Sequence, residues 1–107
     1  MILSSIYFPS LHLTLTYTFC ITLAALAEVE AALQSAGSNK SRILDVTIWL
    51  ADIERDYAAM NVVYDAWVLE GALELTQPPA PSRACVQAKL FSPGHLIEVK
   101  VIAATRR

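Results

Sequence analysis

The residues with the clearest capacity for chemistry are an arginine and a cysteine two positions apart, Arg83 and Cys85, within the run Ser82-Arg83-Ala84-Cys85-Val86. A guanidinium group can bind a carboxylate through two parallel hydrogen bonds, which fixes both the position and the orientation of the ligand. The plainer interpretation is a surface arginine, or an arginine that pairs with Glu98 further along the chain. The residues alone favour this plainer interpretation and leave the binding role open.

The rest of the sequence holds none of the common catalytic motifs. It has no glycine-rich phosphate loop, no pair of histidines at metal-ligand spacing, and no serine or cysteine nucleophile beside an obvious base. Cys20 and Cys85 are too far apart for a metal motif or a disulfide framework, although a single bridge stays open. His12 and His95 are expected to be solvated. No metal site is predicted.

Length and composition limit the class of protein. A chain of 107 residues is expected to form one domain, residues 1–107, around one modest core. Hydrophobic residues make up 55% of the chain and charged residues 17%, which indicates a membrane segment or a subunit that hides apolar surface against copies of itself. The net charge of −2 and the absence of a basic cluster argue against a nucleic-acid partner.

The first 27 residues carry no charged side chain. A signal peptide would need basic residues before its apolar run, and residues 6–27 are diluted by polar residues for a membrane span. Instead, residues 11–23 alternate between apolar and polar side chains, which is typical of a half-buried strand. We therefore expect no membrane segment and a reduced, cytoplasmic protein, while a signal or membrane segment within residues 1–27 stays open.

The elements that follow are predicted from periodicity. From Ala24 the apolar residues recur at helical spacing, and Gly37 stands where a left-handed helix end is expected. Residues 43–51 alternate again and predict a strand. One face of this strand is apolar and the other carries two polar residues and a tryptophan. The apolar face consists of Leu44, Val46, Ile48 and Leu50, and the other of Asp45, Thr47 and Trp49.

Trp49 is either a cover for the sheet edge or a subunit contact, since tryptophan is enriched at interfaces. Asp52 is expected to cap a second helix, whose apolar stripe includes Tyr57 and either Val63 or Tyr64. Asn61 lies within this helix and, without other knowledge, is expected to be solvated.

A proline-rich connector over residues 71–82 leads to two more predicted strands. They span residues 82–90 and 96–105, are separated by the turn Ser92-Pro93-Gly94, and are expected to pair as a hairpin. The order of elements is therefore β-α-β-α-β-β. It predicts the α+β class, with a mixed β-sheet and two helices packed on one face.

Four segments together resemble the RidA/YjgF family of small trimeric proteins. They are residues 45–52, residues 57–67, the run Pro-Ala-Pro-Ser-Arg-Ala-Cys-Val-Gln-Ala that ends at Ala88, and residues 97–104. The resemblance runs from about residue 22 to the end, whereas residues 1–21 do not match the family pattern. It implies a chorismate-mutase-like, RidA-like sandwich that assembles as a homotrimer with its pocket between subunits.

The resemblance also implies an activity, the hydrolysis of reactive 2-imino and 2-enamino acids to 2-oxo acids and ammonia without a metal or organic cofactor. Arg83 would bind the substrate carboxylate, and Glu98 would hold the hydrolytic water and move protons. Cys85 would line the site with its backbone as a ligand of that water. Asn61 matches a family position near the pocket.

The unmatched N-terminus favours an alternative function. The family places two strands before the first helix, and residues 1–21 offer one clear strand. The alternative is a non-catalytic trimeric binding or interaction protein of the same fold with an incomplete site.

Overall fold

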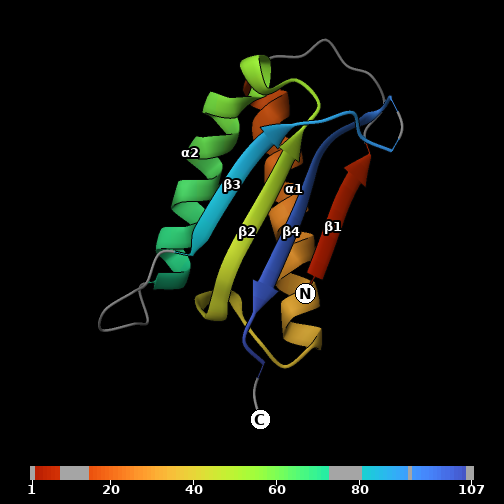
Figure 1. Ribbon diagram of the computed structural model, residues 1–107. Helices are drawn as coiled ribbons and strands as arrows, with labels where there is room; N and C mark the ends of the chain where they lie inside the picture. Colours follow the sequence, from red (N-terminus) through yellow and green to blue (C-terminus); the bar gives the residue numbers. More distant parts are fainter. Residues whose placement is uncertain (1, 8–14, 73–80, 92, 106–107) are drawn as a thin grey trace.

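The computed structural model describes residues 2–7, 15–72, 81–91 and 93–105. Its elements are β1 (Ile2–Tyr7), α1 (Leu15–Ser35), a short 3-10 turn (Lys40–Arg42), β2 (Ile43–Leu50), α2 (Ile53–Ala72), β3 (Ser82–Gln87) and β4 (His95–Ala103). The strands form one sheet in the order β1-β4-β2-β3, in which β2 and β3 are parallel and the other pairs antiparallel. Both helices cover the same face (Figure 1). The predicted α+β class, element order and mixed sheet are confirmed.

The core lies between the two central strands and the two helices. Every second residue of β2 and β4 points to the helices, because successive side chains of a strand alternate between faces. These inward residues are fully buried, as are those at helical spacing on α1 and α2. The buried set includes Val46, Ile48, Leu50, Ile97, Val99 and Val101 from the strands, with Ile21, Ala25, Val29, Leu33 and Met60 from the helices.

The strand predicted over residues 11–23 is wrong from residue 15 onward, where the chain is helical; residues 11–14 lie outside the described residues. The alternation misled because two threonines were counted as solvent-facing. Thr18 and Thr22 are buried, and their hydroxyls donate to Asp56 and to the carbonyl of Thr18, respectively. Leu23 is exposed instead. The first strand of the sheet is β1, which pairs with β4.

The predicted hairpin between residues 82–90 and 96–105 is also wrong. β3 lies at the edge of the sheet and pairs in parallel with β2, whereas β4 is inserted between β2 and β1 (Figure 1). The connection between them therefore passes over β2 instead of folding back as a tight turn. The central position of β4 goes with full burial of Ile97, Val99 and Val101 on its inward face.

Two local predictions are confirmed and one is adjusted. The backbone N–H of Arg55 donates to the Asp52 carboxylate at 3.1 Å, so Asp52 caps α2. Gly37 has φ of 77° and ends α1 with hydrogen bonds back to Gln34 and, through the N–H of Ser38, to Leu33. Leu44 is 59% exposed and does not share the buried face of β2, because the register shifts between Ile43 and Asp45.

One stretch of α1, Tyr17–Ser35, is long and apolar enough to cross a membrane on length and composition alone. Its apolar residues have a second explanation, since Ile21, Ala25, Val29 and Leu33 form the side that packs into the core. The helix therefore resembles the core helix of an α+β fold as much as a spanning segment.

Candidate functional site

A cluster of polar and aromatic side chains forms where α2 crosses the edge strand β3. Arg83 and Cys85 pair with Val46 and Ile48 of β2, so they point to the same, helix-covered side of the sheet as those buried residues. On α2, Tyr57, Asn61 and Tyr64 follow at intervals of four and three residues and share one face. The parallel pairing of β3 with β2 thus brings Arg83 against this face of α2.

The guanidinium of Arg83 is held by three residues of α2. Its Nη1 donates to Asn61 Oδ1 at 2.8 Å, and its Nη2 donates to the Tyr57 hydroxyl at 3.2 Å. Its central carbon lies 4.7 Å from the ring centre of Tyr64 and 5.9 Å from that of Tyr57. These contacts restrict the position of the group.

The charge of Arg83 is not neutralised by a nearby acid. No carboxylate lies within ion-pair distance of Arg83 anywhere in residues 15–72, 81–91 or 93–105. A guanidinium has five N–H donors, and the two bonds to Asn61 and Tyr57 leave three for a ligand. The site therefore offers a partly buried, oriented cation with unused donors, which is suited to a carboxylate.

Cys85 lies on the same side of β3 and is half-buried. Burial raises the pKa of its thiol above the ordinary value of 9.0, and the positive charge of Arg83 opposes part of this rise. The thiol is therefore neutral at neutral pH, and a neutral thiol is a poor nucleophile. This agrees with a cysteine that lines the site and does not attack the substrate.

Tyr64 is the most buried member of the cluster, with 5% of its surface exposed. Burial raises the pKa of its hydroxyl above the ordinary value of 10.0, with Arg83 acting in the opposite direction. That buried hydroxyl has no hydrogen-bond partner among the described residues. The periodicity of the sequence assigned Tyr57, and either Val63 or Tyr64, to the apolar stripe of α2 and gave neither tyrosine a role in the site. The spacing of Tyr57 and Tyr64 by four and three residues from Asn61 was the signal that could have marked them.

Glu98 is not brought to Arg83. It lies in the same row of the sheet as Trp49 and Val86, on the face that the helices leave uncovered. Arg83 is three rows away, which at about 3.3 Å per residue is about 10 Å along the strands, and it points to the opposite face. The ion pair between Arg83 and Glu98 that the sequence left open is therefore absent within one chain.

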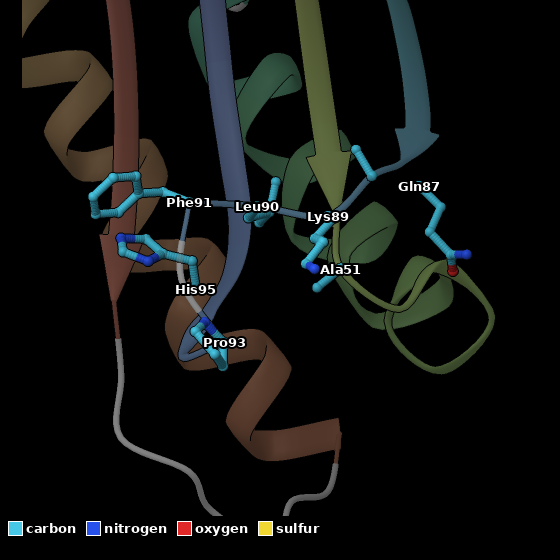
Figure 2. Close-up of a pocket in the computed structure, with 8 residues that line it drawn as sticks. Ala51, Gln87, Lys89, Leu90, Phe91, Pro93 and His95 are labelled. Atoms are coloured by element: carbon cyan, nitrogen blue, oxygen red, sulfur yellow. The ribbon is translucent and has the colours of Figure 1, made fainter.

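A separate open cleft of about 490 Å³ lies at the other end of β3 (Figure 2). It is lined by the residues that follow β2 and β3 and by those that begin β4, including Ala51, Gln87, Lys89, Phe91 and His95. Gln87 pairs with Leu50, four rows from Arg83, so this cleft and the arginine cluster occupy opposite ends of the strand. Neither it nor any other part of the described chain gathers three or more metal-ligating side chains.

Comparison with known proteins places this arrangement in a family. The family model described as Endoribonuclease L-PSP matches residues 21–105. The RutC family protein YoaB of Escherichia coli (strain K12) is 48% identical over 83 residues, which are 78% of this chain and 66% of that protein. A RutC family protein of Haemophilus influenzae is 42% identical over 82 residues, covering 77% of this chain and 64% of that protein.

A solved structure shows the same fold. The chain superposes on NMB1025, a member of the YjgF protein family from Neisseria meningitidis, with a TM-score of 0.74 and 36% identity over 97% of this chain and 77% of that one. The curated relatives are longer, and this chain spans about two thirds of their length. The family model, the relatives and the shared fold agree, and the chain belongs to the RidA/YjgF family.

Proposed function

We propose that this protein hydrolyses reactive 2-imino and 2-enamino acids to 2-oxo acids and ammonia. The observation that carries the proposal is Arg83, a cation held by neutral partners with donors to spare. Every substrate of this class carries a carboxylate next to the reacting carbon, and a fixed guanidinium both binds and orients it.

The proposed reaction needs only water. The C=N carbon of the imine, held by its carboxylate on Arg83, is attacked by a water molecule to give a carbinolamine. A proton then moves to nitrogen, the C–N bond breaks, and ammonia leaves as the C=O bond forms. Glu98 is the proposed acid and base for these proton transfers, with the Cys85 backbone holding the water.

This assignment requires more than one copy of the chain, because Arg83 and Glu98 lie on opposite faces of the same sheet. We propose a homotrimer in which Glu98 of one copy meets Arg83 of the next. Support comes from the helix-free face of the sheet, where Glu98 lies beside the half-buried Trp49 and the exposed apolar Val86. Apolar side chains on an uncovered sheet face favour contact with another chain.

The activity is tested with an amino-acid oxidase that generates 2-imino acids while semicarbazide traps whatever imine remains. An active protein lowers semicarbazone formation. Arg83→Ala is expected to slow imine removal about a hundredfold, since hydrogen bonds to a charged group are worth roughly 3 kcal/mol. Lys89→Ala, which removes an exposed cation a few residues away, is the matched control and keeps wild-type activity. Equal inactivity of wild type and Arg83→Ala would end the enzyme hypothesis.

The shared site is tested by mixing two inactive variants, Arg83→Ala and Glu98→Gln, and exchanging their subunits. In a head-to-tail ring each site takes its arginine from one copy and its glutamate from the next, so about a quarter of randomly mixed sites are intact. Recovery of about that fraction of activity supports the arrangement. A mixture as inactive as its components contradicts it.

The second candidate is a non-catalytic binding or interaction protein of the same fold. The N-terminal segment favours it, because the family model matches residues 21–105 and leaves the residues before them unmatched. Binding of a 2-oxo acid without imine hydrolysis would identify this function. RNA cleavage, suggested by the description of the family model, has no support from the net charge of −2. For either candidate we propose a location in the cytoplasm.

A further inference from the structure

The contact between Arg83 and Tyr64 has a geometry that the remaining α2 contacts do not share. The ring of Tyr64 is 5% exposed and forms part of the core, so it cannot turn away from the guanidinium that lies 4.7 Å from its centre. Tyr57, in contrast, is 39% exposed, and its ring centre is 5.9 Å away. Burial therefore holds the Tyr64 ring in place, whereas the Tyr57 ring is partly open to solvent.

The buried Tyr64 ring can limit the conformations of Arg83, whose side chain lies on the edge strand β3. The side chain of arginine loses rotamer freedom when it is ordered. A cation held over the face of an aromatic ring is attracted to it, and the Tyr64 ring lies 4.7 Å from the central carbon of the Arg83 guanidinium. Asn61 adds a directional contact through its 2.8 Å hydrogen bond. The unused N–H donors are left along the edge of the group.

We propose that Tyr64 is a positioning residue for substrate binding, whose buried ring face holds the Arg83 guanidinium in place and so preorganises it for a carboxylate. This inference rests on the proposed function, since it assumes that Arg83 binds an acid. Tyr64 itself does not touch the reacting atoms. The role belongs to the ring, because the Tyr64 hydroxyl has no hydrogen-bond partner in the described chain.

The use of the ring, and not of the hydroxyl, makes the role separable by substitution. Tyr64→Phe keeps the aromatic face and removes the hydroxyl. Tyr64→Leu keeps an apolar side chain and removes the face, and Tyr64→Met does the same with a more adaptable side chain if leucine leaves the protein unfolded. Val63→Ala is the control for lost packing, because Val63 is buried on α2 next to Tyr64, whereas the hydrogen bonds and ring contacts of Arg83 are made with Asn61, Tyr57 and Tyr64.

The experiment measures calorimetric binding of 2-oxobutanoate, a carboxylate of the product class, together with KM and kcat for imine removal and the thermal midpoint of each variant. Tyr64→Phe is expected to bind within twofold of wild type. Tyr64→Leu, or Met, is expected to weaken binding and raise KM about tenfold, with a smaller change in kcat, because it loses the cation–ring contact. Val63→Ala is expected to lower the thermal midpoint and leave binding unchanged.

The results distinguish a failure of the positioning role of Tyr64 from a failure of the deaminase activity. If wild type binds 2-oxobutanoate but does not hydrolyse imines, the deaminase activity is wrong. The role of Tyr64 is then still tested by comparing the affinities of its variants for 2-oxobutanoate. Failure of wild type to bind any 2-oxo acid would remove both. If Tyr64→Leu and Tyr64→Met bind as wild type does, or Tyr64→Phe loses as much affinity as they do, the positioning role is wrong.

Discussion

Arg55 on α2 and Arg83 on β3 show how the same type of side chain can stabilise the fold in one place and be available to a ligand in another. Arg55 donates from Nε and Nη2 to the two carboxylate oxygens of Asp56, at 2.8 and 2.7 Å. Asp56 is 1% exposed and also accepts a hydrogen bond from Thr18 on α1. Arg83, in contrast, contacts only an amide, a hydroxyl and two aromatic rings.

The difference lies in the partner, because the two side chains carry the same charge. The bond to Asp56 raises the pKa of Arg55 above its ordinary value, and the charge of Arg55 is consumed within the chain. The neutral partners of Arg83 hold it in place, and among the described residues it has no direct ion pair. An ordered arginine without an acid is therefore a better marker of a binding site than an arginine in a salt bridge.

The largest expected effect is a loss of stability when Asp56, the carboxylate partner of Arg55, is removed. Asp56→Ala leaves the buried hydroxyl of Thr18 without its acceptor and Arg55 without its carboxylate partner, which should lower the free energy of unfolding by about 3 kcal/mol. Urea denaturation measures this. Arg83→Ala, measured in parallel, should change the free energy of unfolding by less than about 1 kcal/mol. Equal losses of unfolding free energy in Asp56→Ala and Arg83→Ala would contradict the view that the Arg55–Asp56 pair stabilises the fold and Arg83 does not.

The next largest effect is on ligand affinity, which we expect to depend on Arg83 and not on Arg55. Arg83→Lys keeps the charge but replaces the planar fork by a point charge, and should weaken binding of 2-oxobutanoate about tenfold. Arg55→Lys should leave that affinity within a factor of two. Calorimetric titration of both variants provides the measurement. A larger loss of affinity in Arg55→Lys would show that the buried pair, and not Arg83, governs the site.

The pKa of the Cys85 thiol depends on the charge of Arg83, which opposes the rise caused by burial. Because burial raises the thiol pKa above 9.0, any contribution of this group to stability is complete below pH 9 and is lost as the pH rises through the folded value. In a Cys20→Ser background, iodoacetamide should alkylate folded Cys85 more slowly than the unfolded chain at pH 8. Arg83→Ala should raise the thiol pKa further, since the arginine lowers it. Arg55→Ala should not move it.

The smallest effect is expected at Tyr57. Tyr57→Phe removes the hydroxyl that accepts from Arg83 Nη2 at 3.2 Å but keeps the ring, and the freed N–H at this exposed position can turn to water. Affinity for 2-oxobutanoate should fall by about twofold to threefold, in keeping with an exposed hydrogen bond of about 0.5 kcal/mol. A tenfold loss would mean that Tyr57 contributes as much as the buried ring of Tyr64.

Elements with strong local signals were predictable from the chain. The alternation of β2, the cap at Asp52 and the glycine end of α1 each depend on a few neighbouring residues, and all three are present in the structure. The strand predicted over residues 11–23 failed because Thr18 and Thr22 satisfy their hydroxyls inside the protein. A polar residue type does not reveal whether its partner is water or a buried acceptor.

The candidate site shows the same division. Arg83, Cys85 and Asn61 could be named from residue types and from a family resemblance. The rings beneath the guanidinium and the position of Glu98 on the opposite face of the sheet could not. Strand pairing decided both, because β4 lies between β1 and β2 while β3 runs parallel to β2 at the edge. A hairpin would have placed Arg83 and Glu98 on adjacent strands.

By itself, then, the order of residues determined which segments are helical or extended after residue 24 and which side chains are able to bind an acid. Only the tertiary structure decided which of them meet. Local conformation depends on backbone preferences within a few residues, whereas the neighbour of a strand and the face of a sheet depend on how the whole chain buries its apolar surface.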